Sequence, residues 1–122
     1  MAELRPQVPK AEFVARVRRQ QQSGFLLAFL EEAGEVKAVA GYRFLENLAW
    51  GKFLYVDDLV TTEQARSQGH GQRLFAWLVE QARSQGCDQL HLDSGVQRFG
   101  AHRFYLENRM DITCHHFGLK LR

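Results

Sequence analysis

The sequence has little proline, little cysteine and no long apolar run, and each of these shortages excludes a class of structure. The only prolines are Pro6 and Pro9, so helices and strands can form without interruption after the first ten residues. The two cysteines, Cys87 and Cys114, lack Cys-x-x-Cys spacing and follow no secretory leader, which predicts free thiols in a reduced, cytoplasmic protein. No stretch approaches the roughly 18 apolar residues that cross a bilayer, so we expect no membrane partner.

The sequence also has no large excess of positive over negative charge. The 16 lysines and arginines nearly balance the 14 aspartates and glutamates, so the formal net charge is only +2. The one basic cluster, at 16–19, is too small for the basic surface of a nucleic-acid-binding protein, and we expect no nucleic-acid partner. With 45% apolar and 25% charged residues, the composition is globular, and the length predicts one domain spanning residues 1–122.

The histidines do not indicate a metal site. His91, His102, His115 and His116 do not stand at any spacing typical of zinc ligands, so we expect no metal. The fifth histidine, His70, lies between two glycines in a turn.

Apolar periodicity and turn residues predict an alternation of helices and strands. The expected order is an extended lead-in 1–10, helix 11–22, strands 25–30, 36–44 and 52–60, helix 71–85, strand 87–93, helix 99–108 and a final strand 112–121. The first three strands form an antiparallel meander, because short turns separate them. The next strand follows a helix, which predicts a parallel pair with a right-handed crossover. The fold class is therefore α/β.

The most informative run is 59–74, where an apolar strand stops, turns through Gly69 and Gly71 and enters a helix. Glycines at such a turn permit positive φ and close ligand approach. The first helical turn offers N–H groups and the positive end of the helix dipole to a phosphate. The spacing Arg66-x-x-Gly69-x-Gly71 matches neither the dinucleotide fingerprint nor the P-loop. A diphosphate ligand nevertheless fits this geometry.

The Arg66-x-x-Gly69-x-Gly71 spacing resembles the signature of the GCN5-related N-acetyltransferase (GNAT) family. The run AHRFY at 101–105 is similar to the family's second marker, and the resemblance extends from about Gly24 to the C-terminus. It implies a mixed, mostly antiparallel sheet with a parallel pair that splays apart, flanked by helices. Because only about ten residues precede the first helix, the strand and helix that usually open this fold are expected to be missing or shortened.

The resemblance also implies acetyl-CoA as co-substrate and an amine as acceptor. The pyrophosphate would be held by the turn, at Arg66, Ser67, Gln68, Gly69, His70, Gly71 and Gln72. Within this turn His70 would use its backbone N–H, with its side chain pointing to solvent. The pantetheine arm would pair with the strand edge at Leu59, Val60 and Thr61.

Tyr105 is the residue that the resemblance assigns to protonation of the departing thiolate. A phenol suits this task because it stays protonated at neutral pH and can donate. Arg98 stands where family members often carry an asparagine that contacts the cofactor. An arginine there could meet a phosphate or an acidic acceptor instead.

Asp57 and Asp58 lie on the strand that would carry the thioester. Strand alternation sends their side chains to opposite faces, so at most one would point toward the acceptor, with Tyr55 on the face of Asp57. Either carboxylate could bind the amine or take its proton through a water. A charged strand end that simply faces solvent explains them equally well.

Two functions fit these observations. The leading hypothesis is an acetyl-CoA-dependent N-acetyltransferase in which a primary amine attacks the thioester directly. The alternative is a CoA-binding module without catalysis, regulatory or structural, which the short front end and Arg98 suggest. The strand edge allows a homodimer that covers it. The acceptor cannot be read from the sequence, because the family acetylates many amines on one scaffold.

Overall fold

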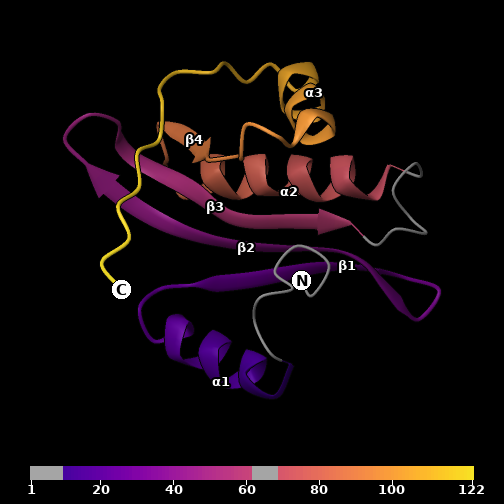
Figure 1. The fold of residues 1–122 in the computed structure, drawn as a ribbon. Coiled ribbons are helices and arrows are strands. Elements are labelled where there is room, and N and C mark those ends of the chain that lie inside the picture. Colours follow the sequence, from indigo (N-terminus) through magenta and orange to yellow (C-terminus); the bar gives the residue numbers. More distant parts are fainter. Residues whose placement is uncertain (1–9, 62–68) are drawn as a thin grey trace. The chain divides into compact units, whose positions relative to one another are not determined.

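The computed structural model describes residues 10–61 and 69–122 and shows a mixed α/β fold (Figure 1). Its elements are α1 (Lys10–Gln21), β1 (Leu26–Glu32), β2 (Glu35–Asn47), β3 (Gly51–Thr61), α2 (His70–Ser84), β4 (Gln89–Leu92) and α3 (Phe99–Glu107). The chain divides into two compact units, the first ending at Leu92 and the second formed by Asp93–Arg122. Residues 1–9 of the expected lead-in lie outside the described part, and Lys10 already belongs to α1.

The sheet lies in the first unit and has the strand order β1-β2-β3-β4. β1 pairs with β2 and β2 with β3 in antiparallel fashion, whereas β3 and β4 are parallel. The turn from β1 to β2 is tight, with positive φ at Ala33 (55°) and Gly34 (78°). The predicted meander and the predicted parallel pair are both confirmed.

A bulge interrupts the pairing of β2 with β3. Tyr42 pairs with Val56 and Gly41 with Asp58, so Asp57 is an extra residue opposite the step between Gly41 and Tyr42. A bulge of this kind breaks the strict alternation of side chains along a strand. Val56 lies in the core before the bulge, and Leu59 packs against the same core after it, three residues later rather than two or four.

The parallel pair is short. It joins Phe53–Val56 of β3 to Gln89–Leu92, and β3 then continues to Thr61. Trp50, in the turn before β3, stacks on His91 of β4 with 3.6 Å between ring centroids. β4 is therefore paired with β3 over its whole length, and β3 continues beyond the end of this pairing.

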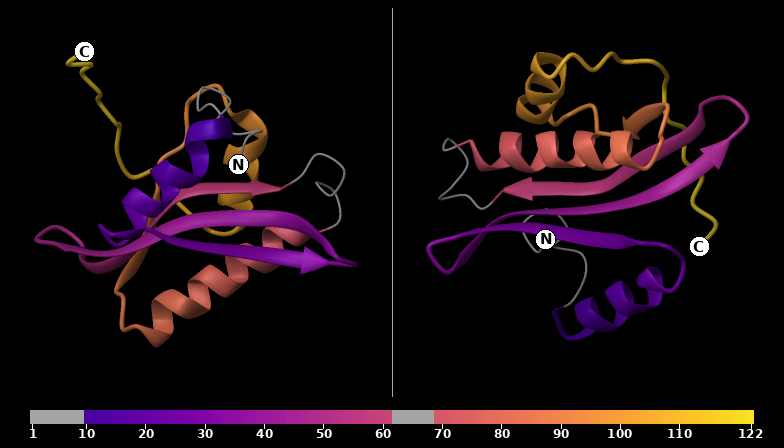
Figure 2. Two further views of the ribbon diagram at one scale, coloured as in Figure 1. Left: turned by 90° about the horizontal axis from the view of Figure 1, so that it is seen from below. Right: turned by 180° about the vertical axis from the view of Figure 1, so that it is seen from behind.

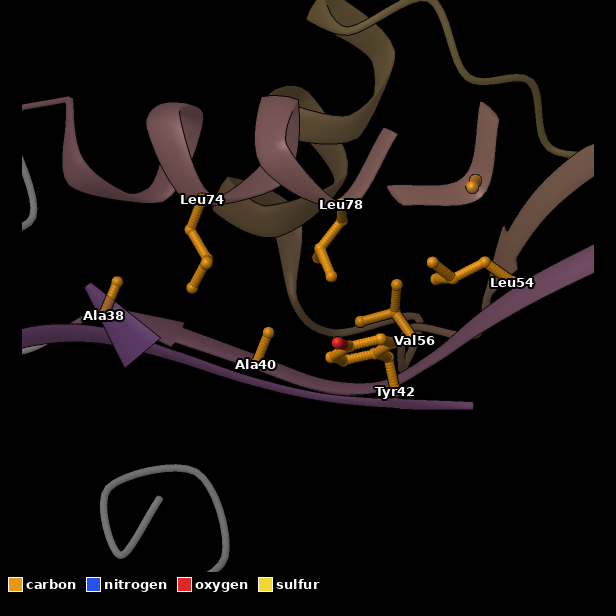
Figure 3. Close-up of a cluster of buried hydrophobic side chains, with 8 residues drawn as sticks. Ala38, Ala40, Tyr42, Leu54, Val56, Leu74 and Leu78 are labelled. Carbon is orange, nitrogen blue, oxygen red and sulfur yellow. The ribbon is translucent and has the colours of Figure 1, made fainter. Parts of the chain in front are cut away.

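The core of the first unit lies between the sheet and α2, which runs across one face of the sheet (Figure 2). Leu74 and Leu78 point from the helix toward Ala38 and Ala40 of β2, as Figure 3 shows. The buried cluster contains Ala38, Ala40, Tyr42, Leu54, Val56, Leu74, Leu78 and Ala82. Its helical members follow the predicted apolar stripe of α2. Cys87 packs against this cluster with a free thiol.

The expected final strand at 112–121 is wrong. Residues 110–122 form no regular secondary structure, and four apolar side chains there, Ile112, Phe117, Leu119 and Leu121, are 76–91% exposed. Alternation of apolar residues favours a strand only where a partner strand supplies hydrogen bonds and covers the apolar face. α3 ends at Glu107, and Arg109, two residues later, has a left-handed backbone with φ of 66°.

No helix in the described ranges is long and apolar enough to cross a membrane.

We expect Leu78→Ala to lower the free energy of unfolding by about 2–5 kcal/mol, because Leu78 is fully buried and its truncation leaves a cavity. Leu48→Ala is the matched control, since Leu48 is fully exposed, and it should change that free energy by less than about 0.5 kcal/mol. Urea unfolding followed by circular dichroism measures both. Equal effects in the two variants would contradict the packing of α2 on the sheet.

Candidate active site

The start of α2 lies against the end of β3. Gly69 precedes the helix with φ of 80°, a left-handed conformation that favours glycine, and its carbonyl accepts a hydrogen bond from the Arg73 N–H at 3.1 Å. Gly71 permits close approach, because a Cβ atom added there would lie 3.0 Å from Thr61 Oγ1. Gly69 thus allows the left-handed backbone of this turn, and Gly71 allows the close approach to β3. Arg66, Ser67 and Gln68 fall outside the described residues.

His70, the first residue of α2, is buried, so the expectation that its side chain points to solvent is wrong. Its exposed fraction is 2%, and its Nε2 lies 2.5 Å from Glu32 Oε2 at the end of β1. Arg73 Nη1 lies 3.5 Å from the same carboxylate oxygen. Glu32 therefore contacts two residues of the first turn of α2.

The charge of Glu32 depends on these contacts. The hydrogen bond with His70 and the charge of its ring lower the pKa of the Glu32 carboxyl from its ordinary value of 4.5. Desolvation acts in the opposite direction, and the charges of Arg73 and Lys37 add to the lowering. Glu32 therefore keeps its negative charge to more acidic pH than an ordinary glutamate does.

Asp57 forms an ion pair with Arg43 of β2. Arg43 Nε donates to Asp57 Oδ2 at 3.0 Å and to Oδ1 at 3.2 Å, and the two side chains are 25% and 22% exposed. The guanidinium also lies over the Phe25 ring, 5.3 Å from its centroid. Tyr55 pairs with Arg43 across the strands, so Tyr55 and Asp57 share a face, as expected.

Asp58 lies on that face too, so the expectation that the two aspartates point to opposite faces is wrong. Asp58 pairs with Gly41, and a Cβ added to Gly41 would lie only 2.4 Å from the Phe25 ring. Gly41 and its partner therefore belong to the face of Phe25 and Arg43, which is opposite to α2. The bulge at Asp57 is the reason, because it shifts the alternation by one residue.

Beyond Val56, no described strand pairs with β3 on the side of β4. This stretch contains Leu59, Val60 and Thr61. Leu59 packs partly against the core, so its side chain contributes to folding whatever its main chain binds. The end of this stretch of β3 and the start of α2 meet at Thr61 and Gly71.

In the second unit, Tyr105 lies on α3 with its ring edge-to-face with Phe104, 5.6 Å between centroids. Burial raises the pKa of the Tyr105 phenol, while the charge of Arg98 and a hydrogen bond with it act in the opposite direction. Arg98 directly precedes α3. The structure thus brings together the two residues of this unit that the sequence singles out.

Residues 2–109 match the model of the acetyltransferase (GNAT) family. The chain belongs to this family. The acetyltransferase is also similar to the uncharacterized N-acetyltransferase YhdJ of Bacillus subtilis, with 33% identity over 108 residues that make up 88% of this chain and 76% of the relative. It is therefore an N-acetyltransferase by family and by relatives.

Two further comparisons cover different extents of this acetyltransferase. The aminoalkylphosphonate N-acetyltransferase of Salmonella typhimurium is 39% identical over 51 residues, 42% of this chain and 33% of that protein. The structure of a putative acetyltransferase from Agrobacterium tumefaciens has a TM-score of 0.80 and 23% identity, over 98% of this chain and 87% of that one. The second comparison supports the fold alone.

The sequence does not predict the contact of Arg43 with Asp57 or that of Glu32 with His70 in this acetyltransferase. The contact of Arg43 could be predicted only from the register of β2 on β3, and Glu32 lies 38 positions from His70. Neither contact therefore has a signal in a short window of sequence. Within the described ranges, no three histidine, cysteine, aspartate or glutamate side chains gather as a metal ion requires.

We expect the melting temperature of the acetyltransferase to exceed that of its Glu32→Gln variant near pH 5.5, and the difference to close as the pH falls below about 4. The folded pKa of Glu32 is lowered, so its ion pair contributes stability above the unfolded pKa of 4.5 and loses it as the pH falls through the folded value. Differential scanning calorimetry from pH 3 to pH 6 measures the difference. A difference that does not vary with pH would contradict the ion pair.

Proposed function

We propose that the protein transfers the acetyl group of acetyl-CoA to a primary amine by direct attack of the amine on the thioester. The observation that carries the proposal is the junction of β3 with α2. The edge of β3 leaves β4 after Val56, and the strand ends at Thr61 against a glycine-bearing helix start. An extended pantetheine arm with a diphosphate at its end fits an open strand edge that leads to a helix N-terminus.

The diphosphate would lie at the first turn of α2. N–H groups of a first helical turn point out of the helix end, and the helix dipole is positive there. Gly69 and Gly71 allow the backbone to approach the ligand, and Gln72 completes the turn. Arg66, Ser67 and Gln68 enter the proposal through the family motif. The pantetheine amides would pair with the main chain of Leu59, Val60 and Thr61, so side-chain identity matters little there.

In the reaction, the nitrogen of a neutral amine attacks the carbonyl carbon of the thioester, and a C–N bond forms. The tetrahedral intermediate then collapses with cleavage of the C–S bond. Tyr105 would give its proton to the departing thiolate, and Arg98 would stabilise the phenolate that remains. Burial suits Tyr105 for this role, because it raises the pKa of the phenol and keeps it protonated before the step.

The proton lost by the amine needs an acceptor, and we assign it to Asp58 through a water, because Asp58 directly precedes the stretch of β3 at Leu59 that would hold the pantetheine arm. Asp57, which is ion-paired with Arg43, is the alternative. Both carboxylates lie on the face opposite to α2 and would favour a cationic acceptor. A small amine that also carries an anionic group, as in the aminoalkylphosphonates of one relative's name, is compatible with that face because Arg43 lies there.

We expect Tyr105→Phe to lower kcat by about 10²–10⁴-fold, because the variant loses the proton donor but keeps the ring. Isothermal titration should show unchanged affinity for acetyl-CoA, with pantetheine as a control ligand that lacks the phosphates and should bind more weakly. Unchanged kcat would reject Tyr105 as the acid. Binding of acetyl-CoA without turnover in either form, across a panel of amines, would favour the non-catalytic module.

We expect Asp58→Asn to lower kcat/KM by about tenfold or more at neutral pH and to lose less at high pH, where a larger share of the free amine is already neutral. Asp57→Asn is the matched control, because it removes the neighbouring carboxylate on the same face. Steady-state rates from pH 6 to pH 10 measure the profiles. A larger loss in Asp57→Asn than in Asp58→Asn would reverse the assignment.

A further inference from the structure

His70 has an unusual position for an ionisable side chain. Its exposed fraction is only 2%, and it is the first residue of the helix that the proposed function places under the diphosphate. A buried imidazole needs a hydrogen-bond partner, because its desolvation is costly otherwise. Glu32 supplies one from the last position of β1.

The first turn of α2 is thereby fixed between two strand ends. On one side, His70 Nε2 contacts Glu32 Oε2 of β1. On the other, Gly71 lies close to Thr61 Oγ1 of β3. The contacts come from consecutive residues of the turn, so a shift of the helix start would disturb both.

The negative charge of Glu32 does not by itself favour a diphosphate at the start of α2. A carboxylate beside a phosphate site repels the ligand, and Glu32 contributes a negative charge next to the start of α2. Among the described residues, Arg73 of α2 and Lys37 of β2 are the other charged groups that act on Glu32, and Lys37 also pairs with Glu35 at 2.7 Å. Glu32 instead accepts a hydrogen bond from the buried imidazole of His70.

We propose that Glu32 and His70 form a positioning pair that holds the first turn of α2 in the geometry that binds the diphosphate of acetyl-CoA. The inference rests on the proposed function, because the ligand is the one proposed there. Neither side chain needs to touch the ligand. Their hydrogen bond aims the backbone N–H groups of the turn, and small displacements of aimed donors cost affinity.

The test separates the hydrogen bond from the charge. Glu32→Ala removes the acceptor and His70→Ala the imidazole, whereas Glu32→Gln keeps an acceptor and His70→Gln keeps a donor near the place of Nε2. Glu35→Gln is the matched control, because Glu35 is a second glutamate of the same hairpin; it lies opposite Glu32 in the strand pairing and forms its ion pair with Lys37. The Kd for acetyl-CoA comes from isothermal titration, kcat and KM from initial rates, and the melting temperature from the ligand-free protein.

We expect Glu32→Ala and His70→Ala each to raise the Kd and the KM for acetyl-CoA about tenfold with little change in kcat. The double variant should be no weaker than either single variant, because the two residues act as a unit. Glu32→Gln and His70→Gln should recover most of the affinity, and Glu35→Gln should behave as the unmodified protein. The melting temperatures show which variants remain folded.

Unchanged affinity in a folded Glu32→Ala variant would overturn the positioning role. So would a loss in Glu32→Gln as large as that in Glu32→Ala, since the carboxylate's charge would then be the property that matters. Additive losses in the double variant would overturn the pairing. Failure of the unmodified protein to bind acetyl-CoA would instead reject the proposed function itself, which keeps the two failures distinct.

Discussion

One extra residue in β3 determines the geometry of the candidate site. Asp57 is the extra residue opposite the step between Gly41 and Tyr42, so the alternation of side chains along β3 shifts by one residue at this point. Just before the extra residue, at Val56, pairing with β4 ends. The same irregularity therefore places both aspartates on the face away from α2, and it directly follows the last residue of β3 that pairs with β4. Without it, an acidic side chain would point into the core beneath the helix.

The helix start completes what the bulge begins. Family membership makes the protein an acetyltransferase, but the membership alone does not say how this chain fixes its turn. Here Gly71 removes a side chain where the helix meets β3, and His70 places one where the helix meets β1. The turn is thus fixed in two ways. Gly71 lets it approach β3 closely, and the His70 imidazole forms a hydrogen bond with β1. The expected single domain and homodimer stay predictions.

Much of the fold could be predicted because its signals are local. The apolar stripe of α2, the turns of the meander and the strand that follows the helix each occupy a short window of sequence. The bulge, the Arg43–Asp57 pair and the burial of His70 depend on register and on residues far apart, which no window contains. The final strand failed for a related reason, because the alternation of Phe117, Leu119 and Leu121 indicates a strand only if a partner is present. The site roles of the loop and of Tyr105 came from family motifs and remain proposals.

The short parallel pair also has a consequence for how the protein forms. β1, β2 and β3 are neighbours in both sequence and space, so their hairpins can close early and quickly. β4 reaches β3 only after the crossover through α2 and gains four paired residues for that longer closure. We therefore expect β4 to join last during folding. A partly folded chain would then have the antiparallel meander of β1, β2 and β3 before it has the parallel pair.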